Sequence, residues 1–162
     1  EGAETGEVWG GGDGEPVDEG LIRIPLYRAE ASAGVGRTVH QEDEYEEVES
    51  AEYLPEPYVR AQYGVKPSRV FDIRVRGNSM HDTISAGERV RCVRWEGEQL
   101  VDGAIYIVRG PWGVLIKRLI QKGATLTLRS DNERYGSTDL ERELFEDQYQ
   151  VIAWLEHVTH QL

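Results

Sequence analysis

Hydrophobic and polar residues alternate along several short runs of this chain, which is the period of half-buried β-strands. In the clearest run, 70–76, Phe71, Ile73 and Val75 lie on one face and Asp72 and two arginines lie on the other. The run 104–108 is continuously apolar, as expected for a strand buried on both faces. Similar runs predict further strands at 21–27, 88–94, 113–120, 125–128 and 149–158.

One short helix is indicated at 57–62. Pro57 would stand in its first turn, and Gly64 follows its last turn. Proline is favoured at the start of a helix and glycine just beyond its end. The strand pattern therefore dominates, and the fold class is mostly β.

The net charge of −12 is concentrated in two segments. Residues 1–20 contain seven acidic residues, seven glycines and no lysine or arginine, so we expect a flexible linker. Residues 41–57 contain eight further acidic residues, and we expect a solvated loop there. The acidic balance argues against this chain binding DNA by itself, because phosphate contacts need a continuous basic face.

Other features of the composition narrow the possible functions. No run of 18 apolar residues exists, so we expect no membrane span. The single Cys92 excludes an internal disulfide and fits a reducing, cytoplasmic compartment. The four histidines lack metal-ligand spacing, so no metal is expected. The chain does not begin with methionine, and we expect it to be part of a longer or processed protein.

Ser79 stands just beyond the predicted strand 70–76. Gly77 and Asn78 tolerate positive φ and end that strand in a sharp turn. The Ser79 hydroxyl can therefore project into a cleft rather than pack in the core. Taken alone, a Gly-Asn-Ser sequence is more often turn chemistry than an active site.

Lys117 interrupts the apolar strand pattern 113–120 and shares a face with Leu115 and Leu119. A lysine on an apolar face either extends its amine to water or remains desolvated with a lowered pKa. A neutral lysine can act as the general base for a serine nucleophile. The residues alone leave both alternatives open.

Three motifs, in this order and spacing, resemble those of the self-cleaving repressor family, which includes LexA, many phage repressors and the polymerase accessory protein UmuD. They are Gly77-Asn78-Ser79-Met80, the turn from Thr83 to Glu88, and the strand from Val114 to Leu119. The resemblance runs from about Leu21 to the end of the chain. One departure is Ala86, which stands where the family has an acidic residue before Gly87.

The resemblance implies a LexA-like or signal-peptidase-like β-domain over 21–162, with one short helix, preceded by the flexible acidic linker 1–20. In the family such a linker leads to an N-terminal helix-turn-helix domain, which this chain does not contain. The resemblance also implies extended chain at 137–145, although Thr138 and Glu141 have the spacing of a capping box. Residues 130–132 resemble the family's polar turn near the catalytic cleft.

The resemblance further implies acyl-transfer chemistry without a cofactor. Ser79 would be the nucleophile, Lys117 the general base, and the N–H groups of Ser79 and Met80 the donors to the oxyanion. The scissile bond would be Ala33–Gly34, within a stretch of small residues that can enter a narrow cleft.

The implied partners are a second copy of the chain, paired through 149–158, and a RecA-type co-protease filament. Operator DNA would be bound only through the missing N-terminal domain, and no membrane partner is expected. Three alternatives remain: a repressor dimerisation module that does not cleave, a UmuD-like polymerase accessory protein, and a signal-peptidase-like enzyme. The lack of an apolar membrane segment argues against the third.

Overall fold

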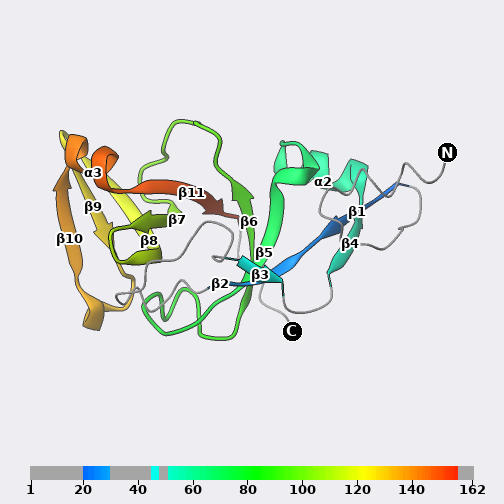
Figure 1. Ribbon diagram of the computed structural model, residues 1–162, viewed down its shortest axis with the longest axis horizontal. Coiled ribbons are helices and arrows are strands. Elements are labelled where there is room, and N and C mark those ends of the chain that lie inside the picture. Colours follow the sequence, from blue (N-terminus) through cyan, green and yellow to red (C-terminus); the bar gives the residue numbers. More distant parts are fainter. Residues whose placement is uncertain (1–19, 30–44, 48–50, 157–162) are drawn as a thin grey trace.

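The computed structural model describes residues 20–29, 45–47 and 51–156 (Figure 1). Most of this part of the chain is strand. In chain order the elements are β1 (Leu21–Ile24), β2 (Leu26–Ala29), β3 (Tyr45–Glu47), β4 (Glu52–Pro55), α2 (Glu56–Tyr63), β5 (Val70–Arg74), β6 (Arg89–Arg94), β7 (Ile105–Gly110), β8 (Gly113–Lys122), β9 (Thr125–Arg129), β10 (Ser137–Glu141), α3 (Arg142–Gln148) and β11 (Gln150–Leu155).

Nine of these strands form one sheet, in the order β10-β9-β8-β7-β11-β6-β5-β2-β3, and β1 with β4 forms a second, two-stranded sheet. Figure 1 shows α3 beside the β10 end of the large sheet and α2 beside the small sheet at the other end. The mostly β fold class is confirmed. The expectation of one short helix is wrong, because α3 is a second helix in the described residues.

The predicted single strand 21–27 is two strands separated by Pro25. Proline has no N–H to donate to a ladder, and the Pro25 carbonyl accepts a hydrogen bond from the Asp72 N–H at 2.8 Å. Before this break β1 pairs antiparallel with β4, and after it β2 pairs parallel with β5. The chain therefore crosses from the small sheet to the large one at Pro25.

The acidic segment 41–57 is not simply a solvated loop. Its described parts include β3 and β4, while 41–44 and 48–50 lie outside the described residues. Strand β4 provides hydrogen-bond partners for the backbone of β1, and Leu54 packs against the buried side chains of Ile24 and Val59. Backbone pairing with β1 and the apolar contacts of Leu54 therefore order β4 despite the acidic residues around it. The linker predicted at 1–20 falls almost entirely outside the described residues.

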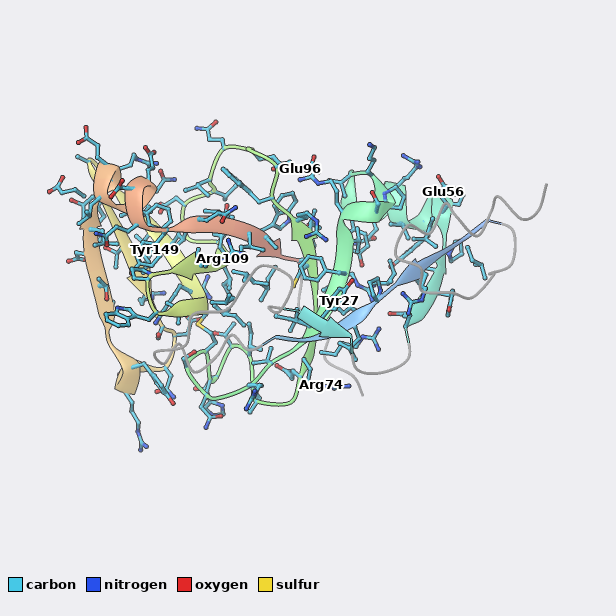
Figure 2. All side chains as sticks on the ribbon, viewed as in Figure 1. Tyr27, Glu56, Arg74, Glu96, Arg109 and Tyr149 are labelled. Atoms are coloured by element: carbon cyan, nitrogen blue, oxygen red, sulfur yellow. The ribbon has the colours of Figure 1, made fainter. Side chains whose placement is uncertain are left out.

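The stretch 137–145 is extended only in its first half. Residues 137–141 form β10, as expected, but α3 begins at Arg142. Phe145 of α3 is 3% exposed and stacks on Tyr149 with the ring centroids 5.2 Å apart. Figure 2 shows Tyr149 close to Arg109 of β7, so the helix returns the chain directly to the sheet. Burial of Phe145 explains why a helix forms there.

The apolar side chains of the large sheet form two principal clusters. Strand β7 contributes Ile107 to one and Tyr106 and Val108 to the other, which confirms that it is buried on both faces. Strand β8 alternates in the same way, with Ile116 in the first cluster and Leu119 in the second. Lys117 thus follows the alternation onto the face of Leu119.

Burial within the chain changes the interpretation of two of the predicted strands. Asp72 of β5 is fully buried, because arginines of the neighbouring strand cover its carboxylate. Strand β11 is not an apolar edge, since it lies between β6 and β7. Its Val151, Ile152 and Ala153 are buried within the chain's own core. The apolar character of this strand therefore needs no partner subunit to account for it.

Candidate functional site

The loop between β5 and β6 carries Ser79. Its two ends are joined by backbone hydrogen bonds from the Val75 N–H to the Glu88 carbonyl at 2.9 Å and from the Gly87 N–H to the Val75 carbonyl at 2.8 Å. Gly77 has φ of 76°, a left-handed conformation that suits glycine, and turns the chain out of the strand. The loop therefore leaves and rejoins the sheet at one fixed point.

Met80 and Ile84 fasten this loop to the core. Their side chains are at most 2% exposed and belong to the apolar cluster that contains Ile107. The Ile84 N–H donates to the Met80 carbonyl at 2.8 Å, which keeps the loop compact between them. Ser79 directly precedes the buried Met80 and is itself half-buried. Anchoring of Met80 thus fixes the position from which the Ser79 hydroxyl is presented.

Lys117 lies in the middle of β8, opposite Tyr106 of β7. Its side chain is half-buried, and its Nζ donates a hydrogen bond to Ser130 Oγ at 2.6 Å. Ser130 is 3% exposed. Burial lowers the pKa of Lys117, because desolvation disfavours the ammonium form. The amine is therefore bonded within the protein rather than extended into water.

Residues 130–132 connect two parts of the site: the loop 75–88 that carries Ser79, here called the serine loop, and β8, which carries Lys117 and is here called the lysine strand. The Asn132 N–H donates to the Ser79 carbonyl at 2.9 Å, and Asn132 Nδ2 donates to the Asn78 carbonyl at 2.8 Å. Ser130, two residues earlier in the same turn, is the partner of Lys117. Ser79 and Lys117 thus flank one short turn. In the described part of the chain no hydrogen bond joins their side chains directly.

Asp131, between these two residues, ties three elements together. Its carboxylate accepts hydrogen bonds from Arg118 of β8 at 2.9 and 2.7 Å and from Thr83 Oγ1 of the serine loop at 2.6 Å. Its backbone N–H points to Met80 Sδ at 3.4 Å. The hydrogen bonds from Arg118 lower the pKa of Asp131, so the carboxylate is ionised at neutral pH.

The backbone N–H groups of Ser79 and Met80 have no acceptor among the described residues. Preorganised backbone donors of this kind can stabilise the oxygen of a tetrahedral intermediate. The turn that holds Ser79 therefore offers donors beside a potential nucleophile, with a desolvated amine across the 130–132 turn.

The structure brings three of the predicted site residues, Ser79, Met80 and Lys117, to the two sides of this turn. Ala33 and Gly34, predicted as the scissile pair, lie outside the described residues. Sequence reasoning noted the 130–132 turn but missed Ser130 as the partner of Lys117. The signal is the strand register, because Ser130 follows Arg129, which pairs with Arg118.

Two kinds of site are not found among the described residues. No group of three or more histidine, cysteine, aspartate or glutamate side chains is arranged to hold a metal ion. No helix in that part of the chain is long and apolar enough to cross a membrane.

Comparison with known proteins identifies the family. A family model described as Peptidase S24-like matches residues 25–155, from just before β2 to the end of β11, and so includes the serine loop, the lysine strand and the 130–132 turn. That family consists of serine peptidases, many of them self-cleaving. No curated protein was found to match the chain. The match confirms the resemblance to LexA, UmuD and phage repressors, and since it spans most of the sequence, the chain belongs to the Peptidase S24-like family.

Proposed function

We propose that this chain is the C-terminal domain of a phage- or SOS-type transcriptional repressor, and that it hydrolyses its own Ala33–Gly34 bond with Ser79 and Lys117. One observation carries the proposal. A lysine with a desolvated amine and a serine with free neighbouring N–H donors flank the same turn, 130–132.

The chemistry follows from these groups. Neutral Lys117 removes the proton of Ser79 Oγ, and the oxygen attacks the Ala33 carbonyl carbon. The oxyanion accepts hydrogen bonds from the N–H groups of Ser79 and Met80. As the C–N bond breaks, Lys117 returns the proton to the Gly34 amine. Water, deprotonated by Lys117, then hydrolyses the acyl-enzyme ester and regenerates Ser79.

The Lys117–Ser130 hydrogen bond is compatible with this role. A neutral amine has two N–H donors and one lone pair, so donating one N–H to Ser130 leaves the lone pair available for the Ser79 proton. Substrate and enzyme are one chain, which gives a high effective concentration of the scissile bond. Docking of the segment that carries Ala33 then controls the rate.

The proposed partners rest on the family resemblance. They are a second copy of the chain, a RecA-type co-protease filament, and operator DNA bound through an N-terminal domain. The apolar residues of β11 do not carry the homodimer, because Val151, Ile152 and Ala153 are buried within one chain and Trp154 and Leu155 are partly buried there.

One observation favours a second candidate function. Among the described residues Lys117 bonds to Ser130, and no hydrogen bond joins it to Ser79. A dimerisation module that does not cleave needs no contact between the serine and the lysine. A UmuD-like accessory protein, by contrast, would cleave like a repressor domain but lack the helix-turn-helix domain upstream.

Incubation of the purified chain across pH 7–10, with mapping of any new N-terminus, tests the proposal. We expect a new N-terminus at Gly34 and a rate that rises with pH and levels off below 10.5, the ordinary pKa of lysine, because the folded pKa is lowered. Ser79→Ala and Lys117→Arg should remain intact, since guanidinium stays protonated. Ser85→Ala, in the same loop, and Lys122→Arg, in the same strand, are matched controls.

Two results would change the conclusion. Cleavage of Ser79→Ala between Ala33 and Gly34 at the original rate would end the mechanism. A folded, unmutated chain that stays whole at every pH would favour the non-cleaving alternative over self-cleavage.

A further inference from the structure

A cavity of about 370 Å³ lies where the small sheet and α2 meet the large sheet. The cavity is lined from β5 and β6 by Asp72, Arg89 and Arg91. Along these strands they alternate with Ile73 and Val90, which share a cluster with Met80 of the Ser79 loop, so the cavity and that loop lie on opposite faces of the strands. The lining residues come from two pairs of elements, which we call the mostly apolar wall and the charged wall. Strand β4 and α2 form the mostly apolar wall with Glu52, Leu54, Pro55, Tyr58 and Tyr63, and β5 and β6 form the charged wall with Asp72, Arg89 and Arg91.

Asp72 organises the charged wall. Its side chain is 1% exposed, and its carboxylate accepts hydrogen bonds from Arg89 Nε at 2.7 Å and from Arg91 Nε and Nη2, both at 2.8 Å. A buried carboxylate requires such partners to remain ionised. The two arginines are therefore held in place by the protein rather than by a ligand.

Arg91 uses four of its five N–H groups in hydrogen bonds within the chain. In addition to the bonds with Asp72, its Nη1 donates to the Tyr63 hydroxyl at 3.0 Å and its Nη2 to Glu52 at 2.5 Å. Each nitrogen of this guanidinium thus has a partner within the chain.

Arg89 differs, since its Nε alone makes a hydrogen bond within the described residues. Its Nη2 is buried without an acceptor, while 30% of the side chain is exposed. A guanidinium has five N–H donors, and a buried donor without a partner destabilises the protein. Nη2 is closed to solvent, whereas Nη1 is not among the buried atoms and has no partner among the described residues. Nη1 is therefore the donor of Arg89 that is open to an acceptor the chain does not provide.

We propose that this cavity binds a small organic carboxylate. Its carboxylate accepts a charge-assisted hydrogen bond from Nη1 of Arg89, the open end of the guanidinium. Its apolar body lies against Tyr58, Leu54 and Pro55. The volume falls within the range of about 300–1,000 Å³ typical of small-molecule sites. The carboxylates of Glu52 and Asp72 on the same cavity disfavour a doubly charged anion such as phosphate.

Calorimetric titration of the full chain with 3-phenylpropionate and with its neutral amide tests the proposal. We expect saturable binding of the acid and binding of the amide that is about tenfold weaker, because the charge-assisted hydrogen bond is lost. Benzoate and hexanoate, titrated in the same way, extend the test to other apolar bodies. Inorganic phosphate should not compete with any of the three acids.

Three variants locate the binding. Arg89→Lys keeps a cation beside Asp72 but removes the Nη1 donor, so the acid should lose about tenfold in affinity and the amide should be unaffected. Tyr58→Ala, on the opposite wall, should weaken both. Arg94→Lys, on the same strand but outside the cavity, is the matched control and should change neither. If Arg89→Lys does not fold, the affinities of Tyr58→Ala and Arg94→Lys for the acid are compared instead. Weaker binding by Tyr58→Ala alone then supports the cavity as the binding site.

The proposal is overturned by any of three results. They are equal affinity for the acid and the amide, tighter binding of phosphate, or no saturable binding of any of the three acids up to about 50 mM, a concentration that would detect even weak ligands.

Discussion

Asp72 and Asp131 are both held by arginine hydrogen bonds of 2.7–2.9 Å, yet they lie in very different regions. Asp72 lies within β5, and both of its arginines lie on β6, the adjacent strand. Asp131 lies in a turn, and its partners come from β8 and from the serine loop. Asp72 reinforces the contact between β5 and β6, which the backbone ladder already makes. Asp131 joins β8 to the serine loop, which no backbone ladder connects.

Similar ion pairs therefore have different roles in this protein. The pair around Asp72 stabilises the fold and leaves one arginine edge unfilled. The pair around Asp131 fixes the distance between the loop of Ser79 and the strand of Lys117. Loss of the first should reduce stability, and loss of the second should reduce mainly the rate of cleavage.

The largest effect is expected for Asp72→Ala. Two buried or half-buried arginines then lose their acceptor, and the free energy of unfolding should fall by about 3–5 kcal/mol. Urea denaturation measures this loss, and the cleavage rate of the molecules that remain folded should be unchanged. Asp147→Ala, which removes an exposed acidic side chain from α3, is the control. A loss below about 1 kcal/mol, the size expected of a surface pair, would remove the distinction between the two regions.

A smaller effect on stability and a selective effect on rate are expected for Asp131→Asn. Cleavage should slow by about 10- to 100-fold because the serine loop is less well positioned. Stability should fall by only about 1–2 kcal/mol. Single-turnover cleavage and urea denaturation of the same preparation give both numbers. An unchanged rate with a large loss of stability would assign Asp131 to the same role as Asp72.

Asp131 should also make the stability of the protein depend on pH in a defined direction. The folded pKa of Asp131 is lowered below its ordinary value of 3.8, so its contribution to stability is complete above 3.8 and is lost as the pH falls through the folded pKa. The unmutated chain should therefore lose its stability advantage over Asp131→Asn in acid, as measured by urea denaturation between pH 5 and 2.

Ser130→Ala should slow cleavage by about tenfold, the loss expected for one positioning hydrogen bond. It should also move the midpoint of the pH–rate profile to lower pH, because the lost acceptor stabilised the ammonium form of Lys117. Ser137→Ala, an exposed serine at the start of β10, provides the comparison. A slower rate with an unmoved midpoint would indicate a purely structural role for Ser130.

The smallest effect is expected for Lys117→Met, measured as stability. Burial lowers the folded pKa of Lys117, so between that pKa and 10.5 the unfolded chain binds more protons and the stability of the unmutated protein rises with pH. Lys117→Met should therefore be the more stable protein at neutral pH. Its advantage should shrink as pH approaches 10.5, which chemical denaturation at pH 7 and pH 10 can detect.

Much of the large sheet could be predicted from the sequence, because strands β5 to β9 have the alternation or continuous apolarity of buried strands. The glycine and prolines around α2 marked that helix equally well. In contrast, α3 forms because Phe145 is buried in the cluster that contains Val108 of β7 and Leu126 of β9, and β4 forms because β1 needs a partner. Neither cause is local, so neither could be seen in the pattern.

The candidate site was predictable in its residue types but not in its connections. Motif resemblance singled out Ser79 and Lys117. Ser130 becomes the partner of Lys117 only through the register of β8 with β9. Asp72 was expected on a solvated face, and its burial depends on two arginines from a strand that follows after 14 further residues.

The interruption at Pro25 determines what a cut at Ala33–Gly34 would leave behind. The first fragment would contain β1 and β2, which remain hydrogen-bonded to β4, β5 and β3 of the second. Hydrolysis would therefore produce a nicked but associated pair of complementing fragments, not two free proteins. Any domain upstream of β1 would stay attached to the rest of the peptidase domain until β1 and β2 dissociate from the two sheets. Chain scission and loss of the tethered domain would thus be separate events, with the second set by the strength of three short ladders.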